Sequence, residues 1–450
     1  MHNAQCYIGE TALNFQFLLP LSKSVRAREL VLDALNGRCV EVEDDNDDIF
    51  VLSRALNQCT MHNAQLSDHS DNFQLSTFNF QLSTLNLNAS GTALRFLTAF
   101  CAVSEGSFLL TGSKRLCERP IKPLLDTLRE MGADIEYVDK EGFAPLLIEG
   151  GKLNGGRVSL DASVSSQFVS ALMLIDDRVE GGVEIEYEGN VASQSYIKLT
   201  ESVIERYKRG VCCSGEKDWS SATVWYAAMA VLKRGKFLLE GLRLDSCQPD
   251  RAIVEVFEKL GVRTIEVDNG VEIEASGEVV EKLVLDCKNM PDAVMYIAVA
   301  ACLLGVEFEI SGVETLRVKE SDRIEALITE MRKCGYIIEC TMHNFCDKRG
   351  QSNLFGLSSG AKITTERSNA QCTIHNSQCT IHNSQFTMHN SQCIMHNAQC
   401  TDLVKIETYN DHRVAMAMAV VGLVRNIEIE NPEVVNKSYP GFWEEMKKIK

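Results

Sequence analysis

The residues best suited to chemistry in this chain are polar clusters that stand directly before short apolar segments. In six places such a cluster opens into what reads as a small-residue-rich apolar helix. The openings are Ser22-Lys23-Ser24, Ser90-Gly91-Thr92, Ser165-Ser166-Gln167, Asp218-Trp219-Ser220-Ser221, Pro291-Asp292 and Asn410-Asp411-His412-Arg413. A helix start presents unpaired N–H groups and a positive dipole end, so several starts aimed at one place would bind phosphate and carboxylate. The pattern therefore indicates an enzyme for multiply anionic small molecules.

The segment 319–323 concentrates charge at the start of an amphipathic helix. Lys319 and Arg323 are one helical turn apart and can face one site, and Glu320 could donate a proton there if burial raised its pKa. The alternative is a solvated helix face with internal salt bridges.

Other charges stand at the mouths of helices too apolar to be exposed. Burying them is costly unless they cap the helix or bind something, so Asp411 either caps its helix and pairs with Arg413 or belongs to a binding site. Asp292 is either an N-cap or a base for a substrate hydroxyl, and Ser165 and Ser166 either cap a helix or donate to phosphate.

The elements that must position these residues repeat along the chain. Segments 121–131, 251–260 and 324–331 carry apolar residues at helical spacing, and a glycine follows each within a few residues. Segments 134–138, 262–267 and 336–339 then read as strands. Several copies of one supersecondary unit are the economical interpretation.

Length and charge limit the function classes. At 450 residues the chain predicts two domains, and its net charge of −17 argues against nucleic-acid or acidic-membrane binding. The apolar stretches 296–306 and 415–424 are too short to span a bilayer, and the N-terminus lacks the pattern of a secretory signal. With 17 cysteines, many of them in repeats, we expect a protein of the reducing cytoplasm.

The repeats are tracts rich in Cys, His, Asn and Gln. The unit Cys-Thr-Ile-His-Asn-Ser-Gln recurs every seven residues through about 371–400, with related pieces at 1–6, 59–65, 72–86 and 340–345. They lack the apolar pattern of packed elements and predict loose surface insertions, near 56–85 and 340–400. Their regular Cys and His spacing suggests zinc, but tandem copying produces such spacing without ligand geometry, so we predict no metal site.

In this order the motifs closely resemble those of the enolpyruvyl transferase family, in particular its branch that acts on shikimate 3-phosphate. The matching stretches are Ser22-Lys23-Ser24 with Arg28, Gly91-Thr92-Ala93-Leu94-Arg95, Glu118-Arg119-Pro120-Ile121, Ser165-Ser166-Gln167, Ser193 with Tyr196, Pro291-Asp292-Ala293, the run from Arg317 to Arg323, Asp411-His412-Arg413, and Lys437 before Tyr439-Pro440.

The resemblance implies an α/β fold of two lobes, each an inside-out barrel built from three βαβαββ units. The expected lobes are 21–213, and 7–20 together with 214–450. Ligand binding is expected to close the lobes on each other.

The implied reaction moves the enolpyruvyl group of phosphoenolpyruvate to the 5-hydroxyl of shikimate 3-phosphate and releases phosphate, in chorismate and aromatic amino acid biosynthesis. Asp292, Glu320 and Lys23 would be catalytic. Shikimate 3-phosphate would be held by Lys23, Ser24, Arg28, Ser165, Ser166, Gln167, Ser193, Tyr196, Asp292 and Lys319. Phosphoenolpyruvate would be held by Lys23, Gly91, Arg95, Arg119, Gln167, Arg323, Arg413 and Lys437. No cofactor and no protein partner are implied, and a monomer is expected.

The chain departs from the family pattern at a few positions. Leu21 stands where Gly or Ala is usual, Arg26-Ala27 where Ser-Asn is usual, and Thr315 where some members have an asparagine. The rival activities are UDP-N-acetylglucosamine enolpyruvyl transfer, which shares the fold, and ligand binding by a catalytically impaired homologue. Arg119 and the Ser165-Ser166-Gln167 triplet favour the shikimate branch.

Overall fold

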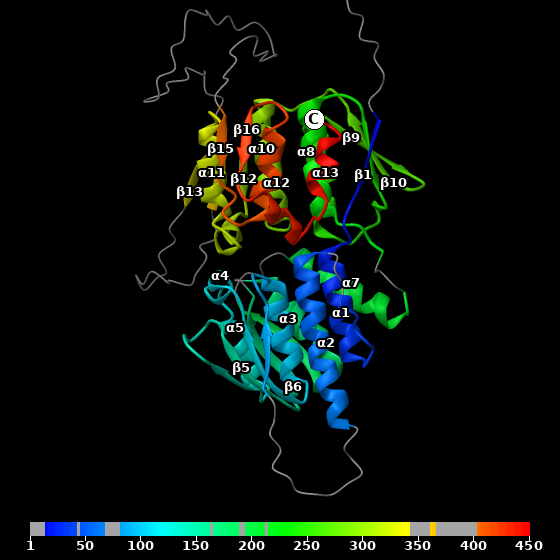
Figure 1. Ribbon diagram of the computed structural model, residues 1–450, viewed down its shortest axis with the longest axis vertical. Helices are drawn as coiled ribbons and strands as arrows, with labels where there is room; N and C mark the ends of the chain where they lie inside the picture. Colours follow the sequence, from blue (N-terminus) through cyan, green and yellow to red (C-terminus); the bar gives the residue numbers. More distant parts are fainter. Residues whose placement is uncertain are drawn as a thin grey trace, which may run out of the picture.

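The computed structural model describes residues 14–42, 46–67, 82–162, 165–188, 194–211, 215–342, 361–365 and 403–450. They form two lobes, one above the other in Figure 1. We call the described residues 22–211 the lower lobe, and residues 14–20 with those from 215 onward the upper lobe. Each lobe has its own apolar core. None of the helices in the described ranges has the length and apolarity needed to cross a membrane.

One βαβαββ unit is complete in the lower lobe. Strands β2 (Ser83–Asn86) and β3 (Gly106–Thr111) are parallel and are joined through α3 (Gly91–Ala102). The short helix α4 (Lys114–Cys117) and α5 (Lys122–Glu130) lead to β4 (Asp134–Tyr137) and β5 (Leu146–Gly150), which complete a sheet of order β2-β3-β5-β4. Gly132, after α5, has a φ of 97°, which L side chains rarely adopt, so a glycine ends this helix.

The upper lobe repeats the same topology in two sheets. One has the order β1-β8-β10-β9 and the other β11-β12-β14-β13, and in each the first two strands are parallel and the rest antiparallel. The strands are β1 (Asn14–Leu18), β8 (Lys236–Glu240), β9 (Val262–Val267), β10 (Gly270–Ala275), β11 (Lys282–Asp286), β12 (Glu307–Ser311), β13 (Glu339–Met342) and β14 (Ala361–Thr365). The repeated unit predicted from the sequence is therefore confirmed.

Two smaller sheets match the first β-α-β part of the same unit, in which the two strands are parallel. Strands β6 (Asn154–Asp161) and β7 (Glu180–Glu188) flank α6 (Ser166–Ile175), and β15 (Val404–Ile406) and β16 (Ile427–Ile429) flank α12 (His412–Val421). The remaining elements are α1 (Lys23–Leu35), α2 (Asp47–Ser67), α7 (Gln194–Lys208), α8 (Trp219–Leu232), α9 (Ile253–Lys259), α10 (Val294–Leu304), α11 (Arg323–Lys333), α13 (Phe442–Lys447) and the 3-10 helices η1 (Asp176–Arg178), η2 (Pro249–Ala252), η3 (Pro291–Ala293), η4 (Glu314–Val318) and η5 (Pro432–Lys437).

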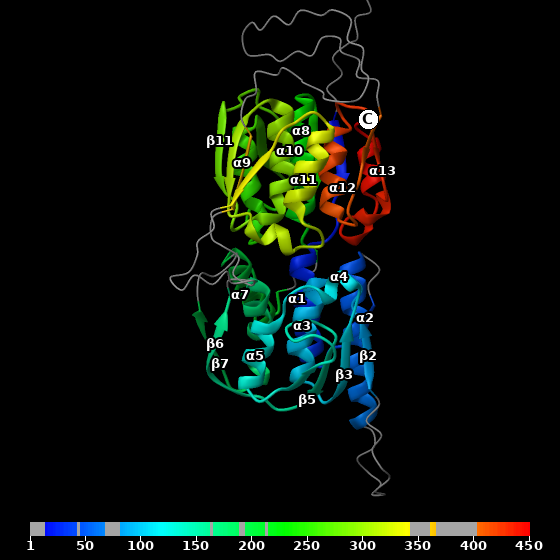
Figure 2. The ribbon, with the colours of Figure 1, turned by 90° about the vertical axis from the view of Figure 1, so that its left-hand side faces the viewer.

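The inner helices carry the polar openings. In the upper lobe α8, α10 and α12 pack on one another, and in the lower lobe α1, α3 and α6 do the same. Helices α8 and α10 are apolar on all sides and are buried almost throughout, while sheets lie outside them (Figure 2). The sides of these helices are covered, so their polar openings can meet a ligand only at the helix ends.

The chain crosses between the lobes at two adjacent places. Leu21 and Lys217 form an antiparallel bridge, and the N–H of Ser22 donates to the carbonyl of Glu216 at 2.7 Å. The structure thus holds the two crossings side by side. We propose lobe limits of 21–213 and of 7–20 with 214–450, as the sequence predicted.

Parts of the predicted insertions are regular structure. Helix α2 extends to Ser67, and Leu52, Leu56 and Cys59 are buried at helical spacing, so a loop beginning near 56 is wrong. Residues 340–342 and 361–365 pair as β13 and β14, so an insertion beginning at 340 is also wrong. The strand predicted at 336–339 begins only at Glu339. The rest of both tracts lies outside the described residues.

Candidate active site

The openings of five inner helices meet in a cleft between the lobes. The upper lobe supplies one wall and the lower lobe the other. The lining residues are Lys23, Ser24, Asp48, Gly91, Thr92, Arg95, Arg119, Pro120, Ser165, Ser166, Gln167, Tyr196, Pro291, Asp292, Thr315, Val318, Lys319, Glu320, Arg323, His412 and Arg413. Most of the predicted site residues are therefore brought together, although they lie far apart in the sequence.

The lower wall holds two guanidinium groups around Gly91, from the buried Arg95 and the half-buried Arg119. Arg95, 3% exposed, donates to the carbonyls of Gly91 at 2.8 Å and Pro120 at 3.2 Å. A Cβ atom at Gly91 would overlap guanidinium nitrogens of both Arg95 and Arg119, so a larger residue there would push both groups aside. Among the residues the structure describes, neither arginine forms an ion pair with a carboxylate, although both lie within the cleft.

Burial works against the charge of these two arginines. It lowers the pKa of Arg95 well below its ordinary value, and the nearby Arg119 adds to this effect. Burial also lowers the pKa of Arg119. An anion in the cleft would reverse both effects, because it would supply the missing opposite charge.

The rest of the lower wall comes from α1, α2 and α6. Lys23 Nζ lies 3.0 Å from Asp48 Oδ2. Gln167 donates from its side-chain amide to the Thr92 hydroxyl at 2.9 Å, and the Ser165 hydroxyl caps α6 by accepting from the Gln167 N–H at 3.2 Å. Ser165 therefore does serve as a cap, and it also lines the cleft.

The upper wall centres on Arg323, which is 2% exposed. Its Nε and Nη2 donate to the two carboxylate oxygens of Asp411 at 2.8 and 3.1 Å, and its Nη1 donates to Asp292 at 2.8 Å. Asp411 also caps α12 by accepting from the Arg413 N–H at 2.9 Å. The predicted cap is confirmed, but the carboxylate pairs with Arg323 rather than with the Arg413 side chain.

Asp292 is an ionised carboxylate among cations rather than an N-cap. Besides Arg323, Lys319 Nζ lies 3.3 Å and Arg413 Nη2 3.9 Å from its oxygens. Burial would raise the pKa of Asp292, but Lys319, Arg323 and Arg413 together hold it well below its ordinary value. The group can therefore accept a proton at neutral pH.

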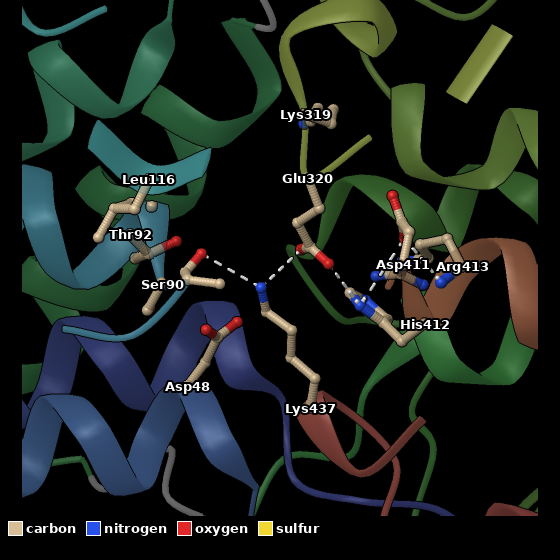
Figure 3. Close-up of polar contacts among 12 residues, drawn as sticks. Asp48, Ser90, Thr92, Leu116, Lys319, Glu320, Asp411, His412, Arg413 and Lys437 are labelled. Carbon is tan, nitrogen blue, oxygen red and sulfur yellow. Dashed lines mark hydrogen bonds and ion pairs between the residues drawn. The ribbon is translucent and has the colours of Figure 1, made fainter. Parts of the chain in front are cut away.

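Glu320, His412 and Lys437 form a polar chain across the cleft (Figure 3). Glu320 Oε2 lies 3.0 Å from His412 Nδ1, and Glu320 Oε1 lies 3.1 Å from Lys437 Nζ. Lys437 also donates to the carbonyl of Ala89 in the lower lobe at 3.2 Å. This lysine, which the family resemblance assigned to phosphoenolpyruvate, thus lies at the edge of the cleft and joins its two walls.

The charge state of Glu320 differs from the expectation. Burial favours a higher pKa, as the sequence argument required, but Lys437, His412 and Arg323 outweigh burial and hold the pKa well below its ordinary value. Burial lowers the pKa of His412, so its ring is neutral at neutral pH. A neutral ring beside a carboxylate carries its proton on Nδ1 and donates it to Glu320.

Two predicted residues lie outside the lining, and a third cannot be placed. Arg28 is buried behind the lower wall, where it donates to Thr200 at 2.8 Å and to the carbonyl of Ser24 at 2.6 Å, so it supports Ser24 instead of facing the cleft. Lys437 is the edge residue described above. Ser193 lies outside the described residues.

One helix opening also lies behind the cleft. Asp218 caps α8 by accepting from the Ser221 N–H at 2.9 Å, and the carbonyl of Ser220 accepts from Arg413 at 3.1 Å. This opening therefore supports Arg413 and does not line the cleft.

The departures from the family pattern have separate outcomes. Leu21 lies in the bridge between the two crossings, and Arg26 pairs with Glu29 at 3.5 Å, so neither residue lines the cleft. Thr315 does line it.

Three charged or titratable residues near the cleft were given no role by sequence reasoning. Asp48 stands in an acidic run that reads as a solvated surface, although Asn46 caps the helix that carries it, by accepting from the Ile49 N–H at 3.1 Å. His412 was visible as the only histidine in a well-organised segment. Asp250 had no local signal: it is 1% exposed, accepts from the Ser220 hydroxyl, and burial and the nearby Asp292 raise its pKa to about 6.

The acidic groups of the upper wall do not require a metal. Glu320, Asp411 and His412 are near enough together to bind an ion. Arg323 already holds both oxygens of Asp411, and Lys437 holds Glu320. Fixed cations thus supply the positive charge, and the expectation of no metal or cofactor stays a prediction.

Comparison with known proteins covers nearly the whole chain. The sequence model of the family described as EPSP synthase (3-phosphoshikimate 1-carboxyvinyltransferase) matches residues 9–446. Proteins named 3-phosphoshikimate 1-carboxyvinyltransferase from Bacteroides fragilis (strain YCH46) and Haemophilus influenzae (strain Rd) are similar at 32% identity, covering 96% of this chain and 94% of the relative, and at 31%, covering 96% and 95%. In fold, the chain is similar to EPSP synthase from Acinetobacter baumannii, with a TM-score of 0.60 and 19% identity over 98% of this chain and 96% of that one. The chain therefore belongs to the EPSP synthase family.

Proposed function

We propose that this protein transfers the enolpyruvyl group of phosphoenolpyruvate to the 5-hydroxyl of shikimate 3-phosphate and releases phosphate. The observation that carries the proposal is the pair of Arg95, which is buried, and Arg119, which is half-buried; both line the cleft without an ion-pair partner among the described residues. Bidentate guanidinium groups suit both the phosphate and the carboxylate of phosphoenolpyruvate. Family membership supports the identity of the acceptor.

The cleft offers separate places for the two substrates. Phosphoenolpyruvate would lie against Gly91, Arg95, Arg119, Arg323, Arg413 and Lys437. Shikimate 3-phosphate would lie against Ser24, Ser165, Ser166, Tyr196, Asp292 and Lys319, with Lys23 and Gln167 touching both. Arg28 would act through Ser24.

The proposed chemistry consists of an addition followed by an elimination. The 5-hydroxyl oxygen adds to C2 of phosphoenolpyruvate while Asp292 accepts the hydroxyl proton and an acid delivers a proton to C3. A base then removes a proton from C3 of this tetrahedral intermediate as its C2–O bond to phosphate breaks. The fixed cations stabilise the charge that develops on the departing phosphate.

The cations explain how Glu320 can exchange a proton at C3. Without substrates, Lys437 and Arg323 help keep its pKa low. Anionic substrates would share these cations, which weakens their hold on Glu320, so its pKa would rise when the cleft is filled. Lys23 is the second candidate for this proton transfer.

We also propose that the protein acts as a monomer in the cytoplasm. Both walls of the cleft come from one chain, so the site needs no second copy. Light scattering coupled to size exclusion should give the mass of one chain, and a dimer whose dissociation abolishes turnover would contradict the monomer.

The direct test is turnover by the purified protein. With phosphoenolpyruvate and shikimate 3-phosphate it should release phosphate and form the enolpyruvyl ether, whereas UDP-N-acetylglucosamine as acceptor should give neither. Tight binding of both substrates without phosphate release would instead support a catalytically impaired homologue.

A further inference from the structure

The side chain of Arg115, in the lower lobe, donates hydrogen bonds to main-chain carbonyls of the upper lobe beside the cleft. Arg115 belongs to α4, which Figure 1 places at the edge of the lower lobe that faces the upper lobe. Its Nε donates to the carbonyl of Glu320 at 3.2 Å, and its Nη2 donates to the carbonyls of Lys319 at 3.1 Å and Arg317 at 3.5 Å. A single guanidinium thus holds the backbone of two residues that line the opposite wall.

The side chains of Lys319 and Glu320 are paired within the upper wall, whereas Arg115 holds their main-chain carbonyls. Helix η4 ends at Val318, and the carbonyls at the end of a helix lack partners within it. Lys319 is extended, with φ of −79° and ψ of −158°. The five donors of a guanidinium fork match several carbonyls of such a turn at once.

Arg115 is also joined to the anion-binding wall through a short hydrogen-bonded segment. Arg119 lies two residues beyond the end of α4, where its N–H donates to the carbonyl of Leu116 at 3.1 Å, and it lines the cleft. The segment is anchored by the Ser113 hydroxyl, which caps α4 by accepting from the Leu116 N–H at 3.3 Å, and by the fully buried Leu116 side chain. A shift of Arg119 on binding an anion would therefore be passed to Arg115.

We propose that Arg115 is a positioning residue that fixes Lys319 and Glu320 in the closed cleft and couples lobe closure to anion binding at Arg119. The inference rests on the proposed function for its kinetic test and adds a residue that acts through the main chain of others. Its own side chain is 42% exposed, so replacing it should not disturb the core.

The experiment compares Arg115→Gln and Arg115→Lys with the neighbouring control Lys114→Gln, which removes the same charge from an exposed side chain of α4. Three quantities are measured: kcat and KM for both substrates, the thermal midpoint, and the radius of gyration by X-ray scattering. Scattering is recorded without ligand and with shikimate 3-phosphate plus inorganic phosphate, a pair that cannot react.

We expect Arg115→Gln to lower kcat about tenfold, the factor that corresponds to one lost charged hydrogen bond, with a smaller change in KM. It should contract less than wild type on ligand addition, with an unchanged thermal midpoint, and Arg115→Lys should recover part of both losses. Lys114→Gln should match wild type.

The outcomes separate this inference from the proposed function. If wild type contracts with ligand but does not turn over, the proposed function fails while the scattering comparison still decides the role of Arg115. If wild type turns over and Arg115→Gln equals Lys114→Gln in kcat and contraction, or loses activity only in proportion to a lower thermal midpoint, the inference is overturned. If wild type neither contracts nor turns over, both are wrong.

Discussion

The two walls of the cleft handle charge in opposite ways. On the lower wall, Arg95 is buried and donates to main-chain carbonyls, Arg119 is half-buried, and neither forms an ion pair with a carboxylate in the part of the chain that the structure describes. On the upper wall, Arg323 and Lys319 are paired with Asp292, and Arg323 also with Asp411. The lower wall therefore has positive charge to spare, whereas the upper wall is close to balanced.

This difference suggests a division of labour. An unpaired buried cation is costly until an anion arrives, so the lower wall is built to bind. The carboxylates of the upper wall are ionised and held in place by cations, so they can accept protons from a bound substrate. The upper wall is therefore suited to proton transfer. Lys23 is the exception on the lower wall, because it pairs with Asp48.

The largest effect should follow removal of the central cation of the upper wall. Arg323→Gln would leave Asp411, which is fully buried, without its ion-pair partner, and this should cost about 3–5 kcal/mol of unfolding free energy. Urea denaturation measures the loss. Arg95→Gln is the matched control, since Arg95 is equally buried but its loss leaves no carboxylate unpaired. Equal destabilisation by both variants would remove the proposed distinction between the walls.

Asp250, beside the upper wall, should make stability depend on pH. Its pKa in the folded protein is raised to about 6, so its contribution is fully present below the unfolded pKa, about 4, and is lost as pH rises through about 6. Asparagine does not ionise, so the stability of the Asp250→Asn variant does not fall in this way as pH rises. Its stability relative to wild type should therefore grow by about 3 kcal/mol between about pH 4 and pH 7, at 1.36 kcal/mol per pKa unit.

Urea denaturation of both proteins across this range provides the check. A difference between variant and wild type that does not change with pH would show that Asp250 titrates normally.

A smaller effect is expected on the lower wall, and it should appear in binding. Arg95→Gln should raise KM for phosphoenolpyruvate about tenfold, because one charged contact is lost, while kcat changes less. The unfolding free energy should stay within about 1 kcal/mol of wild type, since the lost hydrogen bonds to Gly91 and Pro120 are offset by removal of a buried unpaired charge. A large fall in kcat with unchanged KM would place Arg95 in the chemical step instead.

The helix openings were predictable because their signal is local. Ser90, Ser165 and Asp411 each precede an apolar run and each caps the helix that follows. The convergence of these openings followed from the family resemblance and not from the spacing of the residues.

What could not be predicted depends on tertiary packing. Arg28 looks like a site residue, yet Thr200 of α7 draws its guanidinium behind the wall. Asp250 sits in a short 3-10 turn, and only the fold brings it near Asp292. Composition suggested that residues 56–67 are a loose tract, but they are helical, and Leu56 and Cys59 are buried.

The most direct measurement of the division between binding and proton transfer is a comparison of Asp292→Asn with wild type in two assays, substrate binding by calorimetry and phosphate release. The variant should bind both substrates about as well as wild type, because the cations of both walls remain, while phosphate release should fall by about a thousandfold for loss of the base. Phosphate release near the wild-type rate, or loss of binding in parallel with loss of turnover, would contradict it.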